Sequence, residues 1–160
     1  MRDQPPLQER DTETMTDISG QQLLLNFPSC PEFNFANFVV SEGSRMAFET
    51  AMEFCSPNPV PYQALYLFGQ KNLGKTHLLL SMGNQVAEMG LRAVYIQGQD
   101  FVDKMVDDLS PKNLKTMEQL LNVDFFLMDN VESLAHSSKA QEKLYHIYNQ
   151  MMEKGGKLAF

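Results

Sequence analysis

Eight residues, Gly69 to Thr76, have the types and the spacing that hold phosphate groups. They read Gly-Gln-Lys-Asn-Leu-Gly-Lys-Thr and fit the pattern G-x-x-x-x-G-K-[ST]. The glycines let the backbone curl so that its N–H groups point at phosphate oxygens, and the helix that begins there adds its partial positive end. Lys75 would reach the β- and γ-phosphates, and the Thr76 hydroxyl would ligate Mg²⁺. The motif predicts a site for a nucleoside di- or triphosphate; the alternative is a glycine turn that binds nothing.

A second candidate site lies where a buried apolar strand ends at Asp129. This places the carboxylate at the carboxyl edge of the sheet, where ligands of open α/β sheets bind, and we expect it to hold Mg²⁺ through water, opposite Thr76. The next residue, Asn130, stands where many ATPases have an acid. An amide can position the attacking water but cannot accept its proton, so we expect slow hydrolysis, or hydrolysis that needs outside help. Glu132 could replace the acid, but a solvated acid on the loop is the stronger interpretation.

The elements that must position these residues alternate along the chain. Runs of apolar residues predict strands, and apolar residues repeating with the helical period predict helices. The predicted strands are 64–68, 92–96, 123–128 and 157–160, and the predicted helices are 44–54, 76–89, 100–109, 111–121 and 138–153. Strands that alternate with helices indicate a three-layer α/β fold with a parallel sheet.

The composition excludes several classes of protein. The 160 residues carry a formal charge of −7, so no basic surface for duplex DNA is visible. Two distant cysteines, Cys30 and Cys55, lie in no zinc-binding pattern and fit a reducing cytoplasm, and Cys55 is expected to be packed and unreactive. The polar N-terminus does not resemble a signal peptide, and no apolar run approaches the ~18 residues of a membrane span.

Together these residues resemble the nucleotide-binding domain of the bacterial DnaA family, a branch of the AAA+ P-loop ATPases. The resemblance covers residues 33–160, and four stretches carry it: 33–40, 44–48, 73–78 and 123–132. It implies that the backbone of Val39 and Val40 reads the edge of adenine while apolar side chains cover its faces, although those side chains could equally be core. It also implies ATP or ADP with Mg²⁺ as cofactors. The nucleotide-binding residues would be Val39, Val40, Gly69, Asn72, Leu73, Gly74, Lys75, Thr76 and His77.

Departures from the family pattern are informative. Gln70 and Asn72 stand where the initiators have glycine, but Asn tolerates a left-handed backbone, so the loop can still form. Asn130 followed by Glu132 is more similar to Hda, the regulatory branch of the family, than to the initiators, which have two consecutive Asp residues. His77, characteristic of the family after the loop threonine, is interpreted as a packing residue rather than a catalytic one.

The N-terminal residues 1–32 are expected to form a disordered tether. Within it, Gln22-Leu23-Leu24-Leu25-Asn26-Phe27 resembles the peptide with which Hda-type proteins bind the DNA polymerase sliding clamp. Gln22 would make polar contacts, and Leu23, Leu25 and Phe27 would enter an apolar pocket. The alternative is that the leucines pack on the domain's own surface.

The chain ends as the predicted fourth strand begins, a strand that the family's sheet places beside the first. The resemblance implies that a sensor strand, an arginine finger and a helical lid follow Phe160, so we expect a fragment of a longer protein. Without the lid and the finger, we expect negligible ATP hydrolysis by these 160 residues alone.

Three functions fit the sequence. The first is a cytoplasmic, Hda-like regulator that binds adenine nucleotide, docks on the sliding clamp, controls the initiator DnaA and meets DNA only indirectly. The second is an initiator- or loader-type ATPase that assembles on DNA. The third is an interaction module in which nucleotide is a structural filler. Whether the chain forms a homo-oligomer stays open.

Overall fold

The protein is described by a computed structural model that covers residues 25–27, 30–105 and 111–160. Its centre is a five-stranded sheet in the order β1-β3-β4-β5-β2. The strands are β1 (Leu25–Asn26), β2 (Ala64–Leu65), β3 (Ala93–Gln97), β4 (Phe125–Asp129) and β5 (Lys157–Ala159). β2, β3, β4 and β5 run parallel, and β1 pairs antiparallel with β3. The parallel sheet and the position of the fourth predicted strand beside the first confirm two expectations from the sequence.

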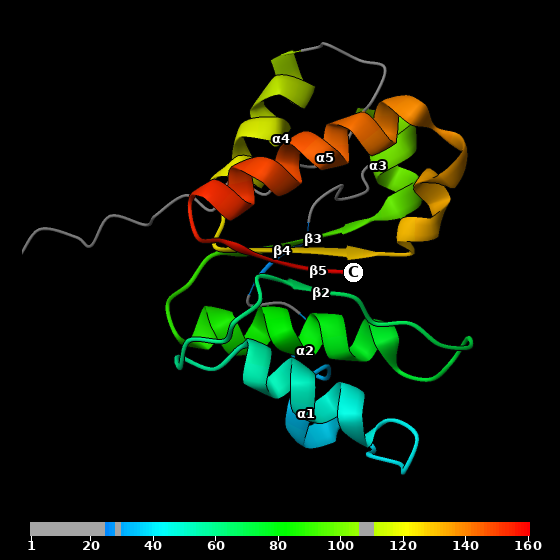
Figure 1. Cartoon of the computed structure of the whole chain (residues 1–160), viewed down its shortest axis with the longest axis vertical. Coiled ribbons are helices and arrows are strands. Elements are labelled where there is room, and N and C mark those ends of the chain that lie inside the picture. Colours follow the sequence, from blue (N-terminus) through cyan, green and yellow to red (C-terminus); the bar gives the residue numbers. More distant parts are fainter. Residues whose placement is uncertain (1–24, 28–29, 106–110) are drawn as a thin grey trace, which may run out of the picture.

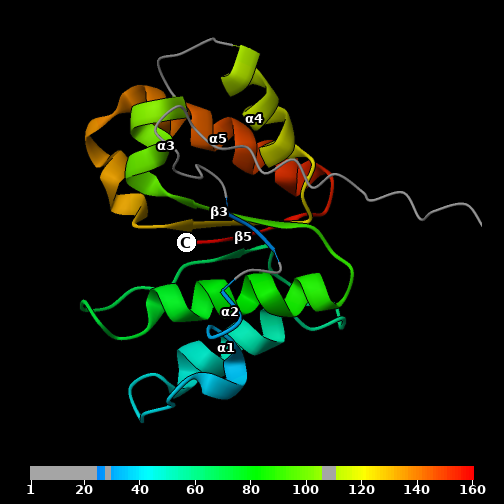
Figure 2. The same cartoon turned by 180° about the vertical axis from the view of Figure 1, so that it is seen from behind.

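Helices cover both faces of this sheet (Figures 1 and 2). One face carries α1 and α2, and the other carries α3, α4 and α5. The bounds are α1 (Arg45–Phe54), α2 (Lys75–Glu88), α3 (Gly98–Met105), α4 (Pro111–Leu121) and α5 (Ser138–Glu153), with short 3-10 helices η1 (Phe35–Asn37) and η2 (Val131–His136). Each predicted helix is present, and its described ends lie close to the predicted ones. None of these helices, within the described residues, has the length and apolar character needed to cross a membrane.

Two elements differ from the predictions. The first predicted strand is shorter, but its ladder continues beyond β2, because Leu67 N donates to Phe160 O at 2.7 Å. The segment 25–26, which the sequence placed in a disordered tether, instead forms β1 on the edge of β3. A two-residue strand has no periodicity to detect, and a partner for it is supplied only by the folded sheet. The other predicted peptide residues, Gln22, Leu23 and Leu24, lie outside the described residues.

The sheet separates two apolar cores. Along β4, Phe126 and Met128 point to the core under α3, α4 and α5, while Phe125 and Leu127 point to the core over α1 and α2. This is the two-residue alternation of a strand that is buried on both faces. Asp129, the next odd-numbered residue, therefore faces α2, the helix that begins with the phosphate-loop lysine.

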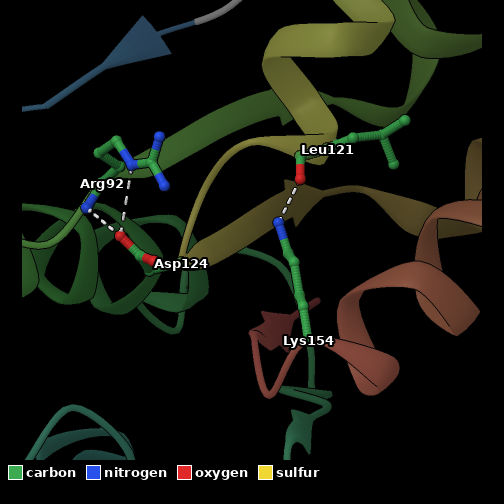
Figure 3. A network of polar contacts seen from close by, with 4 residues as sticks. All are labelled: Arg92, Leu121, Asp124 and Lys154. Atoms are coloured by element: carbon green, nitrogen blue, oxygen red, sulfur yellow. Dashed lines mark hydrogen bonds and ion pairs between the residues drawn. The ribbon is translucent and has the colours of Figure 1, made fainter.

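Polar contacts fix the amino ends of the central strands (Figure 3). Just before β4, Asp124 accepts a hydrogen bond from Arg92 N at 2.8 Å through its Oδ2 atom, and the Arg92 side chain lies 3.6 Å from the same oxygen. That ion pair is exposed and contributes little. The hydrogen bond from the Arg92 backbone to the Asp124 side chain joins the chain at the amino ends of the two strands. On the other side, Lys154 Nζ donates to Leu121 O, and burial lowers the pKa of this lysine.

Burial makes the thiol of Cys55 unreactive. Its side chain is buried among α1 and α2, and burial raises the pKa of the thiol to about 12. A thiol that stays protonated is a poor nucleophile and a poor metal ligand. The expectation that Cys55 is packed and unreactive agrees with this environment.

Phe54 is the aromatic centre of the α1/α2 core. It is fully buried, stacks on Tyr62 with ring centroids 5.7 Å apart and meets Phe125 edge-on at 5.9 Å. Lys157 Nζ donates to the Phe54 carbonyl at 2.7 Å and lies 5.1 Å from the ring centroid. The ring therefore joins α1 to β4 and β5.

We predict that Phe54→Ala lowers the free energy of unfolding by about 3–5 kcal/mol, because it removes a buried ring and leaves a cavity. Urea denaturation followed by circular dichroism measures this change. Met46→Ala on the same helix, where the side chain is 80% exposed, is the matched control and should stay within about 0.5 kcal/mol of the parent. Equal losses for the two variants would contradict the assignment of Phe54 to the core.

Candidate functional site

The loop from Gly69 to Thr76 has the backbone that its motif requires. Asn72 has φ +62° and Gly74 has φ +87°, both in the left-handed region, and α2 begins at Lys75. The expectation that Asn72 replaces a glycine by adopting this backbone is confirmed. Gln70 is not among the described residues with positive φ, so its side chain does not oppose the turn. Lys75 Nζ donates to two loop carbonyls at 2.9 Å, those of Gly69 and Gln70, which keeps the ammonium over the loop.

Gly74 is also required by its neighbour. A Cβ atom at this position would lie 2.6 Å from the ring of Phe38, well inside van der Waals contact. The segment 37–39 therefore packs directly on the phosphate loop. This contact is what brings the predicted adenine-reading segment next to the predicted phosphate site.

Thr76 and Asp129 meet at the start of α2. Thr76 Oγ1 donates to Asp129 Oδ2 at 2.5 Å, although the residues are 53 positions apart. Asp129 is only 5% exposed, and its second oxygen accepts a hydrogen bond from Asn130 N at 2.9 Å. The structure thus brings together the two residues that the sequence proposed as a Mg²⁺ pair.

A ring of side chains surrounds that carboxylate. Tyr95 OH donates to Asp129 Oδ2 at 3.2 Å, and Gln97 Nε2 donates to Tyr95 OH. Asn130 Nδ2 donates to Gln97 Oε1 at 2.9 Å, which closes the ring through the Asn130 backbone. Burial, and then the charge of Asp129, raises the pKa of Tyr95, so its hydroxyl stays a proton donor at neutral pH. The carboxylate and the Asn130 amide are therefore held by the same network.

Tyr95 and Gln97 were not among the sequence-predicted site residues. In the parallel register Gln97 stands beside Asp129, and Tyr95 shares its face of β3. One signal was available, because a polar residue, Gln97, follows the apolar run of this predicted strand. Its partner could not be identified without the register of the two strands.

Two adjoining cavities extend from the loop. One, of about 440 Å³, lies between residues 37–39, the start of α1 and the loop, and it is lined by Val39, Leu73, Gly74, Lys75 and His77, among others. The second, of about 560 Å³, is lined by Lys71, Asn72, Gly74, Lys75, Thr76, Asp129 and Asn130. Asn72, Gly74 and Lys75 border both cavities. The first has apolar walls that suit a flat base, and the second has the lysine, hydroxyl and carboxylate that suit phosphates and a cation.

Val39 and Val40 occupy different positions. Val39 is 87% exposed and lines the first cavity, so it is not core. Val40 is half-buried and is not among the residues that line this cavity. Of the two predicted adenine neighbours, only Val39 is placed at the cavity wall.

His77 is a packing residue, in agreement with the sequence interpretation. Its ring stands edge-on between the rings of Phe33 and Phe38, with both centroid distances 5.2 Å. Its Nε2 atom lies 3.0 Å from Asn34 O and donates to that carbonyl. These contacts hold the segment 33–38 along α2 and shape the wall of the first cavity.

Glu132 does not join the Asp129 cluster. It is exposed on η2 and lines a separate apolar cavity of about 490 Å³, together with Tyr66, Leu134 and Tyr148, among others. This placement agrees with a solvated acid. Within the described part of the chain, no group of three or more His, Cys, Asp or Glu side chains could hold a metal ion by itself.

Comparison with known proteins identifies the family. Residues 30–160 match the family model described as the bacterial DnaA ATPase domain. The chromosomal replication initiator protein DnaA of Thermotoga petrophila is 34% identical over 139 residues, which is 84% of this chain and 31% of the relative. The chain thus spans about a third of that relative's length.

Solved structures give the same result. AMPPCP-bound DnaA from Aquifex aeolicus superposes with a TM-score of 0.75 at 29% identity, covering 81% of this chain and 41% of that one. A replication initiator DnaA bound to AMPPCP and single-stranded DNA superposes with a TM-score of 0.76, at the same identity and coverage. The parallel α/β sheet described above matches these domains of the AAA+ P-loop fold. The chain therefore belongs to the family of bacterial DnaA ATPase domains.

Proposed function

We propose that this domain binds an adenine nucleotide with Mg²⁺ and serves as an Hda-like regulator of replication initiation. The observation that carries the nucleotide proposal is the convergence of Lys75, Thr76 and Asp129 on one cavity. The backbone N–H groups of the loop, the Lys75 side chain and the start of α2 present positive charge to phosphates in this cavity. The AMPPCP-bound DnaA structures support adenine as the base.

The residues at the start of α2 fit Mg²⁺. Mg²⁺ prefers hard oxygen ligands, keeps several waters and is held by one or two protein groups together with phosphates. Thr76 Oγ1 and Asp129 Oδ2 are two such oxygens side by side, and a bound ion would take the place of the hydrogen bond between them. The ion would neutralise phosphate charge, while Asp129 would hold its waters.

Hydrolysis by this site is expected to be slow. Asn130 adopts a left-handed backbone, with φ +54°, which asparagine tolerates better than most residues. Its amide is bound to Gln97 and can orient a water, but it has no lone pair basic enough to accept a proton. Slow hydrolysis suits a regulator that keeps its nucleotide bound and needs a partner protein for hydrolysis to be completed.

The regulatory part of the proposal rests on two sequence features. The series Asp129-Asn130-Val131-Glu132 is similar to Hda, and the segment 22–27 resembles a peptide that binds the sliding clamp. We place the protein in the cytoplasm, with the clamp and the initiator DnaA as its partners and with DNA reached only through them.

The second candidate is an initiator- or loader-type ATPase that assembles on DNA. The relative bound to single-stranded DNA favours it. The formal charge of −7 weighs against it, because phosphate contacts supply most of the affinity of a DNA-binding surface. Retention of the chain on single-stranded DNA at 150 mM salt would favour this candidate.

The third candidate is the interaction module in which nucleotide is a structural filler. Such a module would bind nucleotide but would bind neither DNA nor the clamp.

We predict that Lys75→Ala lowers the affinity for ADP and ATP at least tenfold, because a charge-assisted contact to phosphate is worth about 1.5–3 kcal/mol. Isothermal calorimetry with Mg²⁺ measures this. Lys143→Ala, which removes the same charge from α5, is the control and should bind like the parent. Unchanged binding by the Lys75 variant would refute the nucleotide site.

We predict that Gln97→Leu weakens Mg²⁺-dependent nucleotide binding about tenfold, the loss expected when a residue that holds a metal ligand in position is removed. The variant loses the bonds to Tyr95 and Asn130, so the carboxylate of Asp129 is held less firmly. Binding measured in EDTA should not change. Gln99→Leu, at an exposed position on α3, is the matched control, and equal effects of the two substitutions would contradict this role.

We predict that Leu23→Ala lowers the affinity for the sliding clamp at least tenfold, the loss typical of an apolar anchor in a small interface. Surface plasmon resonance on immobilised clamp measures the effect. Leu7→Ala makes the same substitution in the same tail but outside the predicted peptide, and it should bind like the parent. If neither substitution changes clamp binding, the peptide assignment is wrong.

A further inference from the structure

The N-terminal segment is attached to the domain at the edge of β3. Leu25 pairs with Tyr95 and Asn26 with Val94, in an antiparallel ladder that closes the edge of the parallel sheet (Figure 2). An open sheet edge is a ready template for another strand, and here the protein's own chain fills it. The backbone of residues 25–26 is therefore engaged within the domain.

Phe27, the next residue, enters a notch made by a glycine. A Cβ atom on Gly83 would lie 2.1 Å from the Phe27 ring, so the ring fits only because this position of α2 has no side chain. The ring is half-buried and packs against the core shared by α1 and α2. Glycine inside a helix costs about 1 kcal/mol relative to alanine, and the seated ring gives this glycine a structural reason.

The turn that follows is also attached to α2. Asn84, adjacent to the notch, donates through its Nδ2 atom to Phe33 O at 2.9 Å and to Cys30 O at 3.4 Å. Phe33 N donates to Cys30 O at 2.8 Å, which closes the turn. Two adjacent residues of α2 thus contact the N-terminal segment: Gly83 contacts Phe27, before residues 28–29, and Asn84 binds Cys30 and Phe33, after them.

Leu25, Asn26 and Phe27, the three residues that contact β3 and the Gly83 notch, are also part of the clamp-binding peptide of the proposed function. A Phe27 ring seated at Gly83 cannot also enter a partner's apolar pocket, and a backbone paired with β3 cannot also extend across a partner. We propose that the docking peptide is masked in cis: the β3 edge and the Gly83 notch compete with the partner for Leu25–Phe27. The identity of the partner rests on the proposed function, whereas the masking rests on the contacts of β1 and Phe27.

Competition of this kind has a measurable consequence. The apparent affinity for the partner falls by the fraction of molecules in which the peptide is released. A ladder of two residues and one half-buried ring are a small attachment, so the released fraction is set by few contacts. We expect the full chain to bind the clamp about tenfold more weakly than a synthetic peptide of residues 18–29.

The test is Gly83→Ala in the full chain. The added Cβ expels the Phe27 ring while alanine strengthens the helix, so the domain should stay folded, with unchanged nucleotide affinity as the check. Clamp affinity should rise to within about twofold of the free peptide. Hydrogen exchange of the β1–β3 ladder amides should accelerate at least tenfold, a readout that needs no clamp.

Phe27→Ala provides the internal control for exchange. Once the ring is gone, adding Gly83→Ala should cause no further acceleration in the ladder. The proposal is overturned if Gly83→Ala leaves ladder exchange at the parent rate, or if the chain and the free peptide bind the clamp equally well. If the free peptide does not bind the clamp at all, the partner assigned under the proposed function is wrong, and the exchange rates alone decide whether masking exists.

Discussion

The hydrogen bond from Thr76 to Asp129 is the interaction on which the site depends. It joins the first turn of α2 to the last residue of β4, two elements that otherwise share an apolar core. Apolar contacts hold a helix on a sheet but tolerate sliding, whereas one short bond between a hydroxyl and a buried carboxylate does not. The last two residues of the phosphate loop, Lys75 and Thr76, are the first residues of α2, so this bond also sets the height of the loop above the sheet until the proposed Mg²⁺ ion takes its place.

Two further constraints support that arrangement. The ring through Tyr95, Gln97 and Asn130 prevents the carboxylate from turning, because both of its oxygens already accept hydrogen bonds. On the other side of the loop, the ring of Phe38 packs directly against Gly74, which has no side chain to keep it away. The loop is thus held between an aromatic segment and a polar ring, and its own residues need only supply the left-handed turns.

Much of this could be predicted from the sequence because it is local. The loop motif, the alternation of strands and helices, and the position of Asp129 at a strand end are all patterns along the chain. Even the side of the sheet that Asp129 faces follows from the two-residue alternation. The register that places Gln97 beside Asp129 is not local, since it joins strands that are separated by α3 and α4. The polar ring therefore could not be predicted, and neither could the pairing of β1.

Docking of the N-terminal peptide on a partner and its packing on the domain exclude each other at any one moment, but the contacts along α2 allow the domain to adopt both states. Its first turn carries the phosphate loop, His77 holds the aromatic segment, and Gly83 with Asn84 holds the peptide. The bonds from Asn84 to Phe33 and from His77 to Asn34 do not involve residues 25–27. Release of the peptide would therefore leave the segment 33–38, which borders the first cavity, attached to α2, and the proposed partner could take the peptide without dismantling the proposed nucleotide site.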